Sequence, residues 1–246
     1  MNLLIYIYLI LAVAIGAGLG FGLRRFTTAN LNYGLAFGGA YLLGISVLHL
    51  LPEIYQTSPP GIGIYILVGF LLQLFLEFLS GGLEHGHVHD HTHNESNYLL
   101  QILVGLCIHS FIEGLPLIRY ESFHQEFHDM AHEHTAMHFV YAIMLHKIPA
   151  AFALTIFIMK SSFTKVKAFL VLGMFAISSP VGALVGSVLE LSGAHMSILL
   201  AIVVGSFLHI ATVILFENED KHHHKFSWRK LLFILLGLGF SLLSVH

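Results

Sequence analysis

The chain has 246 residues, of which 56% are hydrophobic and only 10% are charged. A soluble domain is typically about one quarter charged, and the mean hydropathy of this chain is +0.80, so the composition predicts a polytopic membrane protein. The formal net charge of -3 argues against a nucleic-acid partner. Cys107 is the single cysteine, which excludes an internal disulfide and a thiolate metal cluster within one chain.

Apolar stretches recur along the chain, and a helix of about 20 such residues crosses a lipid bilayer. The fold class that we predict is all-α, a single membrane domain of eight transmembrane helices over residues 1–246. The first stretch begins at Met1 without a basic leader or a small-residue cleavage site, so we expect a retained span. In chain order, the predicted spans are 2–23, 33–51, 61–83, 98–118, 138–159, 166–189, 196–216 and 230–245, of which the last is the shortest.

The charges of the connecting loops predict the orientation. If the N-terminus of an eight-span chain lies outside, nine basic residues fall in cytoplasmic loops and only Arg119 falls in an outer loop. This asymmetry follows the positive-inside rule, so we expect both termini outside and a location in the plasma membrane or the bacterial inner membrane. The nine residues are Arg24, Arg25, Lys160, Lys165, Lys167, Lys221, Lys225, Arg229 and Lys230.

The predicted cytoplasmic loop 84–97, between the third and fourth spans, is rich in histidine. Imidazoles at this density bind zinc, copper, nickel or iron, but a tract without fixed geometry binds them weakly and with little selectivity. We therefore interpret the loop as a reservoir or sensor of metal. Its alternating histidines are His85, His87, His89, His91 and His93. For a shorter triplet on the same face, 222–224, solvated histidines without a role are an equally good interpretation.

The predicted outer loop 119–137 mixes histidines with acidic residues. His124, His128 and His132 recur at a spacing of four, so a helical loop would align them for chelation. The acidic residues should also concentrate cations at the outer mouth. A solvated acidic helix is the alternative interpretation.

Ionisable residues inside two apolar spans indicate a metal site. His109 and Glu113 lie one helical turn apart in the fourth span, and His146 lies at the corresponding depth of the fifth. An imidazole nitrogen and a carboxylate oxygen suit a borderline divalent ion such as zinc. A lone histidine in an apolar helix is more often a satisfied core residue, but three polar ligands at matched depth favour a metal, because unpaired groups there are costly. Pro149 frees a backbone carbonyl beside this site.

The chain resembles the ZIP (Zrt/Irt-like) family of divalent metal transporters over nearly its full length. The segments that carry the resemblance are His-Leu-Leu-Pro-Glu at 49–53, His-Ser-Phe-Ile-Glu-Gly at 109–114, His-Lys-Ile-Pro-Ala-Ala at 146–151 and Ile-Ser-Ser-Pro-Val-Gly-Ala at 177–183. The His-Lys-x-Pro-Ala-Ala segment is similar to one subgroup of the family. The resemblance implies eight spans with both termini outside, and it puts His49 and Glu53 near the outer entrance.

The chain departs from the fuller family pattern at four positions. Many members build a two-metal centre with an asparagine, two acidic residues and a glutamate where this chain has Ser110, Lys147, Ala150 and Ser179. The resemblance therefore implies one transport metal on His109, Glu113 and His146, with the Lys147 ammonium near the place of the second ion. A structural ion pair between Lys147 and Glu113 is the alternative role of that lysine.

The resulting hypothesis is transport of a divalent metal ion by alternating access, with zinc first and Fe²⁺, Mn²⁺, Co²⁺ or Cd²⁺ also compatible with N/O ligands. The direction, toward the cytoplasm, is implied by the family. We expect no enzyme activity, no cofactor and, through glycine-rich faces, a homodimer. A membrane di-iron oxidase or desaturase is the alternative, although its histidine boxes should face the cytoplasm. A metal sensor that does not transport is a third hypothesis.

Glu77 is expected to mark the inner end of the third span. His49 and His209 lie in similar sequence segments of the second and seventh spans, as an inverted repeat requires.

Overall fold

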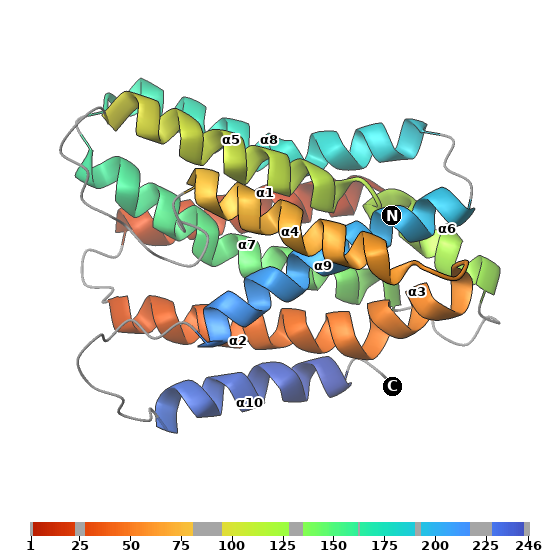
Figure 1. Cartoon of the computed structure of the whole chain (residues 1–246). Coiled ribbons are helices and arrows are strands. Elements are labelled where there is room, and N and C mark those ends of the chain that lie inside the picture. The colour runs from red at the N-terminus through yellow and green to blue at the C-terminus, as the bar shows by residue number, and fades with distance from the viewer. Residues whose placement is uncertain are drawn as a thin grey trace.

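The computed structural model describes residues 2–22, 28–80, 95–127, 135–161, 163–189, 193–216 and 228–243. Within these ranges every regular element is a helix, which confirms the predicted all-α fold. The helices form one bundle, shown in Figure 1. They are α1 (Asn2–Gly22), α2 (Thr28–Ile45), the π-helical turn η1 (Ser46–Leu50), α3 (Leu51–Thr57), α4 (Gly63–Ser80), α5 (Glu95–Gly114), α6 (Leu117–Phe127), α7 (Thr135–Lys160), α8 (Lys165–Val188), α9 (Gly193–Phe216) and α10 (Trp228–Leu243).

Seven helices in the described ranges are long and apolar enough to cross a membrane. The eighth predicted span corresponds to α10, whose 16 residues extend about 24 Å at 1.5 Å per residue, somewhat less than a bilayer core of about 30 Å. α10 packs along α2 and ends at the end of the bundle where α1 begins (Figure 1). The protein is thus an integral multi-pass membrane protein.

Several helices run further than the apolar stretches predict. α2, η1 and α3 continue the second span as far as Thr57, because Pro52 falls in the first turn of α3, where its missing N–H costs nothing. α5 begins at Glu95, inside the predicted loop 84–97, and α6 occupies much of the predicted loop 119–137. Polar helix ends are not predicted by a hydropathy pattern, whereas a helix within the outer loop is compatible with the spacing of its histidines.

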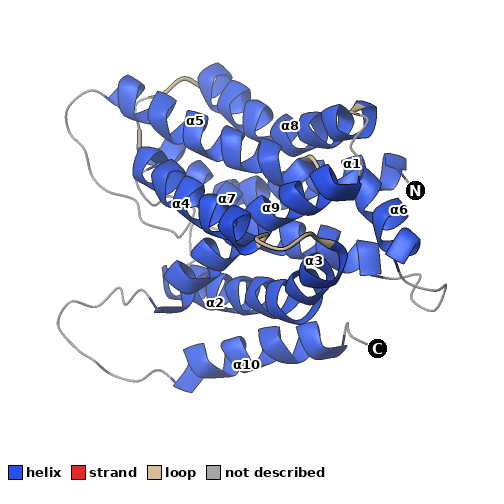
Figure 2. Ribbon diagram, turned by 45° about the vertical axis from the view of Figure 1, so that its right-hand side comes forward, coloured by secondary structure: helices blue, strands red, loops and turns tan. Residues whose placement is uncertain are grey.

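The interior of the bundle is formed above all by α7. Figure 2 shows α7 and α9 enclosed by other helices, with α10 at the edge beside α2. In the most apolar window of α7, 72% of the residues are buried, against 22% in α4. Large apolar side chains on the outer helices remain exposed, among them Phe78 at 82% and Phe169 at 71%. Such a surface is stable only against lipid, and it leaves α7 as the helix best shielded for a polar site.

Glycines bring α5 and α8 into backbone contact. A Cβ atom on Gly114 would lie 2.3 Å from the carbonyl oxygen of Ser179, and one on Gly182 would lie 2.1 Å from the carbonyl oxygen of Phe111. Helices in lipid associate through such close packing because no hydrophobic force drives them together. The contact places Ser179 of α8 directly against the polar end of α5.

Replacing Gly182 by alanine should therefore push α8 away from α5. We expect Gly182→Ala to lower the free energy of unfolding by about 1–3 kcal/mol, the usual cost of overpacking a tight interface, as measured by thermal unfolding in detergent. Gly173→Ala on the same helix is the matched control, because no atom of another helix lies within 4 Å of the added methyl group. Equal unfolding temperatures for the two variants would contradict the packing described.

Candidate metal centre

Three ligand atoms from α5 and α7 converge in the middle of the bundle. His109 and Glu113 of α5 and His146 of α7 are 5%, 1% and 7% exposed. The Nε2 atoms of the two histidines lie 3.4 Å apart, and Glu113 Oε2 lies 3.3 Å from His109 Nε2 and 3.1 Å from His146 Nε2. Within the described ranges this is the one group of three or more His, Cys, Asp or Glu side chains whose ligand atoms could share an ion.

The triangle has the dimensions of one face of a zinc coordination tetrahedron. With bonds of about 2.0–2.1 Å, neighbouring ligands on zinc lie about 3.3 Å apart, close to all three distances from His109, Glu113 and His146. Glu113 Oε2 is buried and has no hydrogen-bond partner in the described part of the chain. A buried acceptor of this kind is costly unless a cation or proton reaches it. The donor set therefore fits an ion such as zinc, with a fourth coordination position left open.

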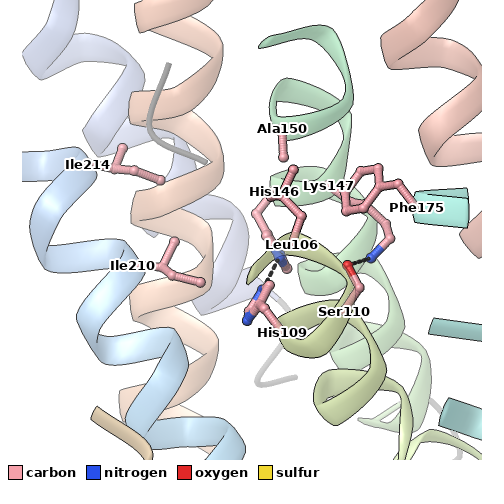
Figure 3. A pocket seen from close by; sticks show the side chains of 9 residues that line it. All are labelled: Leu106, His109, Ser110, His146, Lys147, Ala150, Phe175, Ile210 and Ile214. Carbon is pink, nitrogen blue, oxygen red and sulfur yellow. Dashed lines mark hydrogen bonds between the residues drawn. The ribbon is translucent and has the colours of Figure 1, made fainter. Parts of the chain in front are cut away.

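Hydrogen bonds at the far side of each imidazole fix the orientation of the rings. The Nδ1–H of His146 donates to the carbonyl oxygen of Ala142 at 3.1 Å, which leaves Nε2 with its lone pair. His109 Nδ1 lies 3.3 Å from Ser206 Oγ on α9. Figure 3 shows the two rings meeting through their inner nitrogens. Partners of this kind hold the tautomer and the angle of a metal-binding histidine.

Lys147 is buried beside the triangle, with 1% exposure. Its ammonium group forms an ion pair with Glu113 Oε1 and donates to Ser179 Oγ at 2.7 Å and to Ser110 Oγ at 2.9 Å. The bond to Ser110 is drawn in Figure 3. Three acceptors satisfy its three N–H groups. The two oxygens of the Glu113 carboxylate thus have different neighbours: Oε1 contacts Lys147, and Oε2 faces the two histidines.

A narrow pocket adjoins the triangle on the side of Ala150 (Figure 3). It leaves about 10 Å³ for water, close to the smallest space that holds one molecule. A water at this point could complete the coordination of an ion. The pocket is lined by Leu106, His109, Ser110, His146, Lys147, Ala150, Phe175, Ile210 and Ile214.

The other predicted site residues lie elsewhere or outside the described ranges. Glu53 is buried in α3 and accepts a hydrogen bond of 2.6 Å from the Tyr120 hydroxyl, while the ring of His49 stacks against that of His138, with the ring centroids 6.4 Å apart. None of these groups joins the triangle. His85, His87, His89, His91 and His93 fall outside the described residues, as do residues 128–134 of the outer loop and the triplet 222–224.

Polar residues on α4 and α9 were the main omission of the sequence analysis. Ser206 donates to Gln73 Oε1 at 2.9 Å and supports His109, and the carboxylate of Glu77 contacts the imidazole of His209. Glu77 lies in the last turn of α4, as expected, but its carboxylate also contacts His209 of α9, which the sequence did not predict. Polar residues one turn apart in otherwise apolar spans were the signal that could have revealed this contact.

A bundle of membrane-spanning helices around a buried His/Glu donor set is the architecture of a protein that could hold a metal ion within the membrane. The pattern of the family described as ZIP Zinc transporter matches residues 83–245, more than half of the chain. This protein therefore belongs to the ZIP zinc transporter family. The matched region contains His109, Glu113, His146 and Lys147. Membership points to a transporter rather than an enzyme, and to the metal ion as substrate rather than cofactor.

A relative in Dictyostelium discoideum, the protein zntD, is 33% identical to this chain over 172 residues. The similar region covers 65% of this chain but only 24% of zntD. The chain thus matches about a quarter of that relative's length, and the similarity lies within a much longer protein. The subgroup predicted from the His-Lys-x-Pro-Ala-Ala segment stays a prediction.

Removing the charge of Lys147 should destabilise the protein, because the buried carboxylate of Glu113 then lacks a neighbouring positive charge. We expect Lys147→Met to lower the free energy of unfolding by about 3–5 kcal/mol, because Glu113 is then a buried charge without its counter-ion. The double variant Lys147→Met with Glu113→Gln should recover much of that loss. Unfolding of the four proteins in metal-free detergent measures the coupling. Additive effects of the two substitutions would contradict the ion pair.

Proposed function

We propose that this protein transports one divalent metal ion at a time across the membrane, with zinc as its main substrate. The observation that carries the proposal is the triangle of two imidazole nitrogens and one carboxylate oxygen, with sides of 3.1–3.4 Å, buried between α5 and α7. Imidazole ligands favour zinc and later transition metals over magnesium and calcium. Three protein ligands with a fourth position open allow an ion to enter and leave.

Lys147 supports a single-ion mechanism. Its ammonium group lies among Ser110, Ser179 and Glu113 Oε1, where other members of the family are expected to hold a second metal. One positive charge fixed by the protein neutralises Glu113 before any metal binds. The centre is therefore stable in the membrane both with and without its substrate, as alternating access requires.

The arrangement of charges supports the orientation of the bundle, and the direction of transport, toward the cytoplasm, is what the family implies. Lys160, Lys165, Arg229 and Lys230 lie at the end of the bundle opposite α3 and α6 (Figure 1). The positive-inside rule then makes this the cytoplasmic end, with both termini outside in a cell membrane. Ions would enter past His49, Glu53 and the outer loop, and would leave toward the histidines of loop 84–97. A homodimer and an inverted repeat stay predictions.

Substitution of the ligands tests the site. In proteoliposomes that contain the purified protein, His109→Ala and Glu113→Ala should each abolish saturable zinc uptake, because two ligands hold an ion poorly in the membrane interior. Leu71→Ala, which changes a lipid-facing side chain of α4 with 60% exposure, is the control and should transport normally. Uptake close to that of the parent protein by both ligand variants would rule out this centre. Metal binding by a parent protein that shows no uptake would instead favour a sensor.

Ion counting tests the role of Lys147. After the histidines of residues 85–93, 124–138 and 222–224 are replaced by serine, the centre formed by His109, Glu113 and His146 should bind one zinc ion. Lys147→Asp combined with Ala150→Glu places two carboxylates beside His146 on α7 and should allow a second ion to bind. Anomalous scattering from zinc-loaded crystals locates the ions and gives both numbers at the centre. Two ions at the centre with Lys147 intact would show that the lysine does not replace a metal.

A further inference from the structure

A line of polar side chains leads away from the metal centre between α4 and α9. Ser206 of α9 has a single hydroxyl hydrogen, which it donates to Gln73 Oε1 of α4 at 2.9 Å. Its oxygen is then the acceptor for His109 Nδ1–H at 3.3 Å. Gln73 and Ser206 are buried, with exposures of 1% and 7%. The proton positions of His109 are thus set by residues on two other helices.

The line continues one helical turn further with an ionisable pair. Glu77 follows Gln73 by four residues on α4, and His209 follows Ser206 by three residues on α9, so each lies on the same face as its predecessor. Glu77 Oε2 and His209 Nε2 are in direct contact. The His209 side chain is 5% exposed, whereas that of Glu77 is 20% exposed. The pair is therefore anchored inside the bundle and partly open at its surface.

Glycine contacts hold α4 and α9 together independently of this pair. A Cβ atom on Gly69 would lie 2.0 Å from the carbonyl oxygen of Ile202, and one on Gly205 would lie 2.0 Å from the carbonyl oxygen of Ile66. Buried ion pairs add little net stability, so the close backbone packing is the better account of why these helices associate. An ionisable pair inside a membrane that is not needed for packing indicates a function.

We infer that Glu77 and His209 form a second, weaker divalent-cation site, which receives the ion after it leaves the metal centre. The inference rests on the proposed transport function. The pair offers one imidazole nitrogen and one carboxylate oxygen, the same ligand types as the centre. It has two protein ligands, whereas the centre has three. Glu77 lies three residues before Ser80, at the end of α4 that leads into loop 84–97. Weaker binding at this point favours onward release, since an ion must be able to leave each site it occupies.

Uptake kinetics in proteoliposomes test the site in the full chain. Glu77→Ala and His209→Ala should lower the maximum rate of zinc uptake by about tenfold, equivalent to about 1.4 kcal/mol, without raising KM, because the first ion still binds at the centre. Glu77→Gln, which keeps the size of the side chain, should show the same loss. Leu71→Ala on the lipid face of α4 is the control and should keep the parent rate.

Crystals soaked in Cd²⁺ test binding directly by anomalous scattering. We expect a strong peak among His109, Glu113 and His146 and a weaker one between Glu77 and His209. The weaker peak should disappear in Glu77→Gln while the first persists. A full uptake rate in Glu77→Gln, or a Cd²⁺-soaked parent crystal with the first peak alone, would overturn the second site. A parent protein with neither uptake nor the first peak would instead refute the proposed function.

Discussion

A carboxylate at the centre of an apolar bundle is the constraint on which the rest of this structure depends. Glu113 is 1% exposed, and an ionised carboxylate in that environment is stable only beside a positive charge. Lys147 supplies the charge from a neighbouring helix, and the hydroxyls of Ser110 and Ser179 complete its hydrogen bonds. The ion pair fixes one oxygen of Glu113 and leaves the other facing His109 and His146.

This arrangement requires helices that approach closely, because the supporting side chains are short. A serine side chain reaches a neighbouring helix only when the two helices lie close together. Glycines at 114 and 182 bring α8 close enough for Ser179 to contact Glu113 at 2.9 Å. The same relation holds between α4 and α9, where glycines at 69 and 205 accompany the contact of Ser206 with Gln73. Small residues on these helices therefore determine the geometry of the centre as much as the ligands do.

The sequence predicted features that depend on local periodicity. Hydropathy identified the spans, and a spacing of four placed His109 and Glu113 on one face of α5. Contacts between helices could not be read in this way, because they depend on how each helix is rotated about its axis. Gln73 and Ser206 are 133 positions apart, and no local pattern links them. The ion pair of Lys147 with Glu113 was one of the two predicted roles of that lysine, whereas its bonds to Ser110 and Ser179 required the structure.

X-ray absorption at the zinc K edge tests the central claim most directly. Protein with its loop histidines replaced by serine, loaded with one equivalent of zinc, should show a first shell of about four N/O ligands at about 2.0–2.1 Å with scattering from two imidazole rings. No metal–metal scattering should appear near about 3.5–4 Å, the separation found in two-metal sites. A metal–metal signal at that distance, or a first shell without imidazole, would contradict a single ion held by His109, His146 and Glu113 beside a lysine.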